Sequence, residues 1–185
     1  MRKNFAFSLD IQRKFMSELM KAKCISQCVI LCTCNRTEVY FCGSPAAPEY
    51  VDKLLAEYSK IPKEIFSAKK RFYQDEKSII HLFKVASGID SMVIGEDEIL
   101  GQTKKAYHSA KEADTVSHEL NIIFQSAIAC AKKIKTETAL SKTSVSIASL
   151  AANEAVKLGG NINVLLIGAT GKTGTTVLKL SLIHI

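Results

Sequence analysis

A thiol and a guanidinium follow an apolar, β-type run near the N-terminus. The run covers residues 29–31, a second one covers residues 39–41, and Cys34 and Arg36 lie between them. Residues of this kind predict two short strands joined through residues 34–37. A free thiol with a pKa near ~8.5 is only slightly ionised at neutral pH, so a nucleophilic cysteine needs a nearby cation or base. Residues two apart on an extended chain face the same side, so the pattern predicts nucleophilic chemistry at Cys34 with help from Arg36.

Two other interpretations of these cysteines stay open. Cys32 and Cys34 could be small buried hydrophobes, as free cysteines usually are. A metal site fits less well, because C-x3-C-x3-C-x-C matches neither the zinc pairs nor the iron–sulfur spacings. The cysteines of this cluster are Cys24, Cys28, Cys32, Cys34 and Cys42. We therefore predict no metal.

The composition indicates a cytosolic protein. The 185 residues suffice for one domain, or for one domain and part of a second. No apolar run approaches the ~18 residues of a membrane helix, and the N-terminus is charged too early for a signal peptide. Six cysteines without a secretory signal indicate reduced thiols, so we expect a cytoplasmic location. The net charge of +7 suits a phosphate-rich partner, although a lysine-rich surface usually serves only solubility.

Helical periodicity predicts the elements that position these residues. Helices are expected over residues 9–23, 49–59, 75–86, from about 97, 120–134 and 145–158, and a short strand is a candidate at residues 71–73. A linker with two prolines and a glycine precedes the second of these helices, and Ser117 is the expected N-cap of the fifth.

His81 lies in the helix expected over residues 75–86, nearly opposite the apolar stripe of that helix. The stripe consists of Ile79, Ile80, Leu82, Phe83 and Ala86. This position excludes the core and leaves a histidine that is either solvated or directed into a cleft. Acidic residues at 96–98 begin the next helix, where the helix dipole favours negative charge and explains them without a metal.

The sequence period changes after residue 160. Residues 163–167 predict a buried strand, residues 168–174 a glycine-rich turn, and residues 175–180 a helix, an arrangement whose N–H groups can hold a pyrophosphate. An ATP-binding Walker loop would need glycine where the chain has Leu166, so that interpretation fails. The dinucleotide interpretation fits, although the spacing is G-x-x-G-x-x-G rather than G-x-G-x-x-G.

Four motifs together resemble glutamyl-tRNA reductase of the bacterial tetrapyrrole pathway, over about residues 3–180. They are residues 31–38 (LCTCNRTE), 81–92 (HLFKVASGIDSM), 95–96 (GE) and 99–102 (ILGQ). The resemblance implies an α+β N-terminal catalytic domain with a ferredoxin-like sheet plus helices, followed by the start of a Rossmann-type α/β NADPH domain. The corresponding expected segments are the catalytic glutamyl-tRNA-binding domain over 1–145, a connecting helix over 146–160 and a truncated NADPH-binding domain over 161–185.

The resemblance also implies an activity, the NADPH-dependent reduction of glutamyl-tRNA(Glu) to glutamate-1-semialdehyde, which begins 5-aminolevulinate and porphyrin synthesis. Cys34 would hold the glutamyl group as a thioester after releasing tRNA, and His81 would assist acid–base chemistry. Arg36 would bind the carboxylate of glutamate. The other substrate-binding residues would be Thr33, Asn35, Ser91, Glu96 and Gln102. The NADPH-binding residues would be Gly168, Ala169, Thr170, Gly171, Lys172, Thr173 and Gly174.

The partners implied are glutamyl-tRNA, a second copy in a full-length homodimer, and the glutamate-1-semialdehyde aminotransferase as the recipient of channelled product. The chain departs from the family pattern at Cys32, where the family usually has serine, so a second thiol accompanies the nucleophile. The family's first strand, ahead of residues 2–8, is also missing, and the nucleotide domain ends early. We therefore expect a fragment that forms the thioester without completing reduction. The alternative function is a non-catalytic module that binds tRNA or a partner protein.

Overall fold

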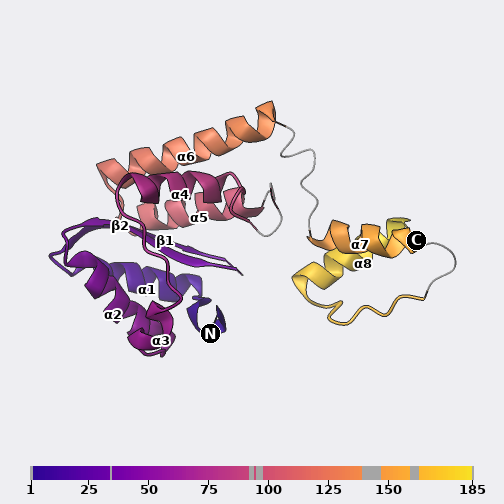
Figure 1. The fold of residues 1–185 in the computed structure, drawn as a ribbon, viewed down its shortest axis with the longest axis horizontal. Helices are drawn as coiled ribbons and strands as arrows, with labels where there is room; N and C mark the ends of the chain where they lie inside the picture. The colour runs from indigo at the N-terminus through magenta and orange to yellow at the C-terminus, as the bar shows by residue number, and fades with distance from the viewer. Residues whose placement is uncertain are drawn as a thin grey trace.

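A small sheet surrounded by helices forms the N-terminal part of the chain (Figure 1). The computed structural model describes residues 2–33, 35–91, 94, 98–138, 147–158 and 163–184. The elements are the 3-10 helix η1 (Arg2–Phe5), α1 (Leu9–Met20), β1 (Ile25–Cys32), β2 (Thr37–Gly43), α2 (Ala47–Ser59), α3 (Lys63–Ser67), α4 (Glu76–Ala86), α5 (Glu98–Glu112), α6 (His118–Glu137), α7 (Ile147–Lys157) and α8 (Lys172–His184). The predicted helices around the strand pair are therefore confirmed, and their ends shift by a few residues.

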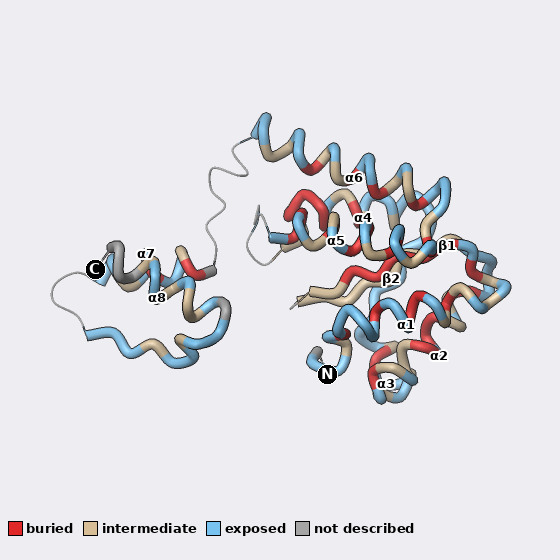
Figure 2. Tube along the Cα trace, turned by 180° about the vertical axis from the view of Figure 1, so that it is seen from behind, coloured by how far each residue is buried: buried red, intermediate tan, exposed pale blue. Residues whose placement is uncertain are grey.

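β1 and β2 form an antiparallel hairpin in which Ile30 lies opposite Val39 and Cys32 lies opposite Thr37. The sheet lies between α1 and α2 on one side and α4, α5 and α6 on the other (Figure 1). Helices cover both faces of β1, and its residues are buried in succession from position 27 to position 31, as the red tube in Figure 2 shows. This continuous burial explains why the first strand has an unbroken apolar sequence.

The N-terminus of α6 is capped from the sheet. Gln27 is buried in β1, and its Oε1 accepts hydrogen bonds from the backbone N–H groups of Ser117 (2.9 Å) and Leu120 (3.1 Å). Ser117 occupies the N-cap position, but its side chain makes no capping bond. Ser117 is thus the N-cap residue, as predicted, but a buried amide from a neighbouring element supplies the acceptor in place of its side chain.

The segments predicted as strands outside the hairpin do not form strands. Residues 70–74 are irregular and solvent-exposed, so the candidate strand at 71–73 is wrong. Residues 163–166 are also irregular, and Leu165 and Ile167 are 86% and 87% exposed, so the buried strand predicted there is wrong as well. A buried parallel strand needs neighbouring strands for its backbone bonds, and the described residues form a single sheet of two strands. The expected ferredoxin-like sheet is reduced to this hairpin.

The apolar stripe predicted for α4 is only partly correct. Leu82, Val85 and Ala86 are buried against the core, whereas Ile79 and Ile80 are 37% and 45% exposed. Ile79 and Ile80 instead line a shallow pocket together with Phe83 and Ile134. α7 and α8 pack against each other. Within the described ranges, the structure contains no helix with the length and apolar character needed to cross a bilayer.

Candidate active site

The loop of the hairpin, residues 33–36, is built around the hydroxyl of Thr33. Thr33 Oγ1 accepts hydrogen bonds from the backbone N–H groups of Asn35 (3.1 Å) and Arg36 (3.0 Å). The backbone N–H of Thr33 donates to the carbonyl oxygen of Arg36 at 2.8 Å. These bonds are those of a turn in which a threonine side chain replaces a backbone acceptor. Thr33 thus shapes the loop, and its contact with a substrate stays a prediction.

Cys34, the predicted nucleophile, lies outside the described residues. The neighbouring thiol, Cys32, is half-buried at the end of β1. Its Sγ lies 3.2 Å from the carbonyl oxygen of Phe5 and 3.3 Å from the hydroxyl of Thr37. Cys32 is therefore engaged by the N-terminal segment and by its own cross-strand neighbour.

Arg36 joins this loop to the segment that follows α4. Its Nη1 donates to Oε1 of Glu38 (3.1 Å) and to Oδ2 of Asp90 (2.8 Å), and its Nη2 donates to the carbonyl oxygen of Asp90. Burial alone would lower the pKa of Arg36, but the hydrogen bonds and charges of Asp90 and Glu38 outweigh it and raise that pKa. The guanidinium is consequently fixed in place as a cation.

The position of Asp90 depends on how α4 ends. Gly88 has φ +77°, and its N–H donates to the carbonyl oxygen of Val85 (3.0 Å). The N–H of Ile89 donates to the carbonyl oxygen of Lys84 (3.0 Å). This pair of bonds around a left-handed glycine is a Schellman motif, which ends the helix and reverses the chain. The reversal brings Asp90 back to Arg36.

Glu38 connects Arg36 to the predicted histidine. Oε1 of Glu38 lies 3.0 Å from Nε2 of His81, and Oε2 accepts a hydrogen bond from the hydroxyl of Tyr40. The side chains of Arg36, Glu38 and His81 are only 16–19% exposed. Arg36, Glu38, Tyr40 and His81 are hereafter called the Glu38 cluster. The structure thus brings together Arg36 and His81, two of the predicted site residues, through a third residue.

The ionisation of the Glu38 cluster follows from its contacts. Burial alone would raise the pKa of Glu38, but hydrogen bonds from His81 and Tyr40 and the charges of His81 and Arg36 lower it overall. Burial first, and then the charge of Glu38, raise the pKa of the Tyr40 hydroxyl. Glu38 is therefore a carboxylate and Tyr40 a neutral phenol at neutral pH.

Tyr73 covers the histidine from outside the cluster. Its ring stacks on the imidazole of His81, with ring centres 4.6 Å apart and an angle of 23° between the planes. Tyr73 belongs to the irregular segment 70–74, which includes the candidate strand at 71–73. This contact orients the ring of His81 and shields one of its faces.

The remaining predicted substrate residues have different placements. Asn35 and Ser91 are half-buried, in the hairpin loop and in the bend after α4 respectively. Gln102 is half-buried on α5, and Glu96 lies outside the described residues. Of the three that the structure describes, Asn35, Ser91 and Gln102, none has a side chain joined to the Glu38 cluster by a hydrogen bond.

The glycine-rich turn leads directly into α8. Gly168 has φ +84°, and the N–H of Gly171 donates to its carbonyl oxygen at 3.0 Å. A Cβ at Gly174 would lie 2.1 Å from the same oxygen, so only glycine fits there. The predicted helix is confirmed, but it begins at Lys172 rather than at Thr175.

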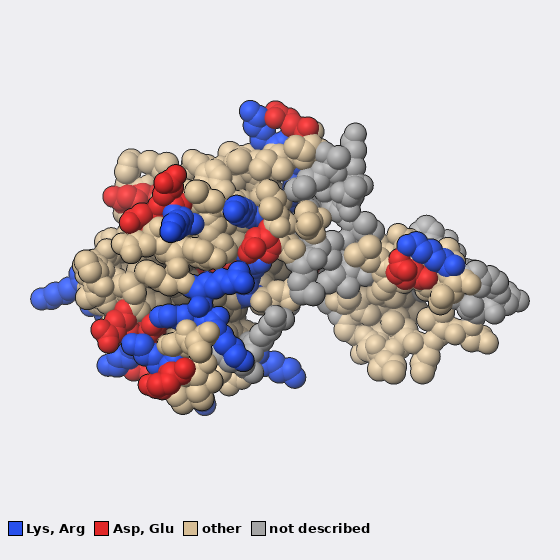
Figure 3. Space-filling model, in the orientation of Figure 1, with Lys and Arg blue, Asp and Glu red and all other residues tan. Residues whose placement is uncertain are grey.

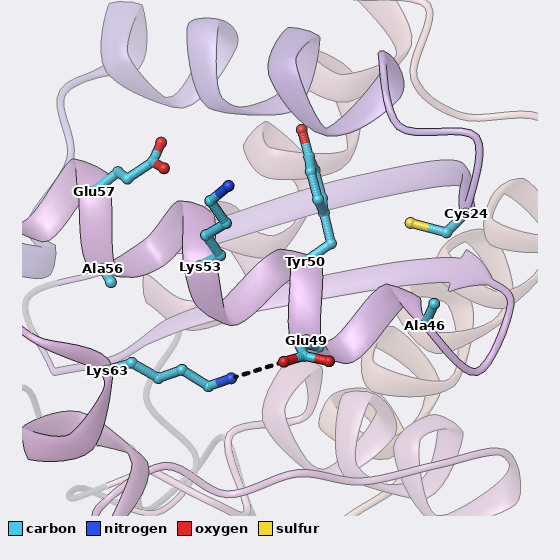
Figure 4. A pocket seen from close by; sticks show the side chains of 8 residues that line it. All are labelled: Cys24, Ala46, Glu49, Tyr50, Lys53, Ala56, Glu57 and Lys63. Carbon is cyan, nitrogen blue, oxygen red and sulfur yellow. Dashed lines mark ion pairs between the residues drawn. The ribbon is translucent and has the colours of Figure 1, made fainter.

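A shallow pocket of about 580 Å³ lies along α2, away from the predicted site. Figure 4 shows its lining, which consists of Cys24, Ala46, Glu49, Tyr50, Lys53, Ala56, Glu57 and Lys63. Both signs of charge occur there, and Lys63 pairs with Glu49 at 3.7 Å. On the face shown in Figure 3, Lys and Arg side chains gather over the lower half of the N-terminal part, with acidic side chains among them. The pocket is lined by no residue of the Glu38 cluster.

Sequence reasoning assigned no role to Glu38, Tyr40, Tyr73 or Asp90. Glu38 and Tyr40 alternate along β2 (Thr37–Gly43) and so share one face, but the strand predicted from the sequence covered only residues 39–41 and left Glu38 out. Tyr73 and Asp90 belong to irregular segments, whose paths depend on tertiary packing rather than on a local period.

Comparison with known proteins places this geometry in a family. The family described as "Glutamyl-tRNAGlu reductase, N-terminal domain" matches residues 1–138. A protein of Brevibacillus brevis named glutamyl-tRNA reductase is 38% identical over 173 residues, which cover 91% of this chain and 38% of that protein. The protein of the same name from Neisseria meningitidis is 37% identical over 171 residues, covering 91% of this chain and 40% of that protein.

A solved structure agrees with these relatives. The glutamyl-tRNA reductase from Methanopyrus kandleri matches with a TM-score of 0.70 and 32% identity, over 98% of this chain and 43% of that one. The chain spans about two fifths of the length of the curated relatives it matches. By the match over residues 1–138, the chain belongs to the glutamyl-tRNA reductase family and carries its N-terminal domain.

Proposed function

We propose that this chain carries the acyl-transfer site of an NADPH-dependent glutamyl-tRNA reductase, which forms glutamate-1-semialdehyde for tetrapyrrole synthesis. The observation that carries the proposal is the Glu38 cluster, which joins a fixed arginine to a histidine next to the loop in which Cys34 occurs. A cation and an acid–base group beside a thiol are the parts that acyl transfer needs.

Arg36 is suited to bind the side-chain carboxylate of a glutamyl group. The bonds to Glu38 and Asp90 use both Nη1 protons and one Nη2 proton. Among the described residues, no acceptor bonds to the Nε–H or to the second Nη2–H. These two donors form one edge of the guanidinium and match the two oxygens of a carboxylate.

Cys34 is the proposed nucleophile. Its thiolate sulfur would attack the carbonyl carbon of the aminoacyl ester, and the bond to the ribose oxygen would break as the S–C bond forms. His81 would take the thiol proton and return it to the departing ribose hydroxyl. The glutamyl group would then remain on the sulfur as a thioester, which is a better hydride acceptor than an ester.

Residues 168–174 are proposed to hold the phosphates of NADPH, which supplies the hydride when bound. The tight turn at Gly168, which leads directly into α8, supports this assignment, since phosphate-binding turns open a helix in this way. The N–H groups at the start of α8 would face the phosphates. We assign residues 161–185 to the beginning of a Rossmann-type nucleotide domain on this basis.

The remaining parts of the proposal follow from family membership. Thr33, Asn35, Ser91, Glu96 and Gln102 are the proposed substrate contacts. A homodimer, a cytoplasmic location and transfer of product to the glutamate-1-semialdehyde aminotransferase are proposed for the complete protein.

Acyl capture tests this function directly. The chain is mixed with glutamyl-tRNA labelled in the glutamyl group, and label bound to protein is measured before and after treatment with hydroxylamine, which cleaves thioesters. Hydroxylamine-sensitive label supports the enzyme. The alternative, a binding module, would leave no label on the protein. Its affinity for tRNA would depend on salt and would not change when the thiols are alkylated.

A further inference from the structure

The structure contains a largely buried carboxylate that bonds to both the arginine and the histidine assigned to the site. Glu38 lies on β2 between two residues assigned to the site, and its oxygens accept hydrogen bonds from both of them. Acidic residues on exposed strands usually face solvent, whereas the side chain of Glu38 is 18% exposed. Such a buried carboxylate requires partners, and all of its partners belong to the Glu38 cluster.

The protonation of His81 follows from this contact. A carboxylate can only accept hydrogen bonds, so the Nε2 of His81, 3.0 Å from Oε1 of Glu38, must carry a proton. A neutral imidazole then has its lone pair on Nδ1. Within the described part of the chain, Nδ1 has no hydrogen-bond partner, and Tyr73 covers a face of the ring rather than this edge.

We propose that Glu38 is a positioning residue that holds His81 as its Nε2–H tautomer and leaves Nδ1 as the nitrogen that exchanges protons with the substrate. The tautomer is inferred from the geometry alone, whereas the role of Nδ1 in proton exchange rests on the proposed function. When Nδ1 takes the thiol proton, the ring becomes a cation, and Glu38 stabilises that cation through the same hydrogen bond. When the ribose oxygen leaves, Nδ1 returns the proton and the ring becomes neutral again.

The remaining donors keep Glu38 in place for this role. Oε2 is held by the hydroxyl of Tyr40, whose ring packs edge-on against Phe124 of α6 with ring centres 5.3 Å apart. Oε1 accepts hydrogen bonds from Nε2 of His81 and from Nη1 of Arg36, and Arg36 is held in turn by Asp90. The carboxylate is thus fixed from two sides, and the histidine takes its orientation from it.

Nitrogen NMR of the histidine rings tests the proposal independently of activity. The chain is labelled with 15N-histidine, and long-range 1H–15N spectra are recorded over a series of pH values. The His81 signals are identified by their loss in His81→Gln. In the neutral form we expect Nε2 to give a protonated, pyrrole-type shift and Nδ1 an unprotonated, pyridine-type shift. Glu38→Gln should move both shifts toward a mixture of tautomers, because an amide can donate as well as accept.

Matched variants separate this role from general effects. Glu112→Gln makes the same chemical change in an exposed ion pair with Arg13 and should leave the His81 shifts unchanged. Tyr40→Phe removes one donor but keeps the carboxylate, so the Nε2–H tautomer should persist. In acyl capture, Glu38→Gln should slow label transfer at least about tenfold while tRNA affinity stays within about twofold.

Each outcome decides the proposal. An Nδ1–H tautomer in the unsubstituted chain, or His81 shifts that Glu38→Gln leaves unchanged, would overturn it. The first of these does not depend on Glu38→Gln, so it decides the proposal even if that variant does not fold. A chain with the expected tautomer that captures no glutamyl label would contradict the proposed function while leaving the positioning role of Glu38 supported.

Discussion

Nη1 of Arg36 lies 2.8 Å from Oδ2 of Asp90, and this contact joins the β1–β2 hairpin to the turn that ends α4. The same turn is held by the left-handed glycine Gly88, so the geometry of a helix terminus is transmitted to the proposed carboxylate-binding arginine. Arg36 therefore depends on residues that are distant in sequence, and changes at these residues should affect acyl capture.

Asp90→Asn should slow acyl capture about tenfold, because it removes the charge that fixes Arg36 and a charge-assisted hydrogen bond is worth about 1.5–3 kcal/mol. We expect the lower end of that range, since the Asp90 side chain is 41% exposed. Single-turnover transfer of labelled glutamate measures the effect. Asp10→Asn makes the same change on the exposed face of α1 and serves as the control; equal rates for the two variants would contradict the role of Asp90.

Replacing either of two glycines by alanine should change the stability of the chain, in opposite directions for the two positions. Gly88→Ala should destabilise the chain by about 1 kcal/mol, because an L-residue is strained at φ +77°. Gly101→Ala should stabilise it by about 0.5–1 kcal/mol, because Gly101 lies inside α5 with no atom within 4 Å of an added Cβ. Urea unfolding of both variants gives the free energies, and a loss of stability in Gly101→Ala would show that this helix face is covered.

Stability should fall at acid pH partly because of Glu38. Its pKa is lowered in the folded state, so its contribution is present above the unfolded value of about 4.3 and is lost as pH falls through the lower, folded value. Urea unfolding between about pH 3 and pH 7 should show this decline, and Glu38→Gln should flatten it. Glu112→Gln should retain the full slope; a slope unchanged by Glu38→Gln would mean that other carboxyls carry the acid sensitivity.

Cys28 should resist alkylation in the folded chain. Burial in β1 raises the pKa of its thiol to about 12, which leaves almost no thiolate at pH 8. Iodoacetamide treatment followed by peptide mass spectrometry should find Cys28 unmodified until urea unfolds the chain. Modification of Cys28 at the rate of the half-buried Cys24 would show that the β1 core opens readily.

The helices α1, α2, α4, α5 and α6 were predictable because their apolar residues recur at helical spacing. The hairpin was predictable because both strands are β-rich and the loop between them is polar. The exposure of Ile79 and Ile80 is not encoded in periodicity, because it depends on which residues of other elements lie opposite them. The strand expected at 163–167 also shows this limit, since an apolar run specifies burial only when a partner strand exists.

Site residues that belong to a sequence motif were predictable. Residues whose role depends on contacts between elements distant in sequence were not. Arg36 and His81 came from the motifs, and the structure joins them. Glu38 lies in the same motif, but its role emerges only when β2 and α4 are packed together. The cap that Gln27 provides to α6 was equally hidden, because the residue and the helix are far apart in sequence.

The most direct test of the account is to locate the acyl group after the chain reacts with labelled glutamyl-tRNA. Peptide mass spectrometry is applied to the unsubstituted chain, to Cys34→Ala and to Cys32→Ala, which differ by one thiol in the same segment. We predict a hydroxylamine-sensitive glutamyl adduct on Cys34, absent in Cys34→Ala and retained in Cys32→Ala. An adduct that survives Cys34→Ala and disappears in Cys32→Ala would contradict it.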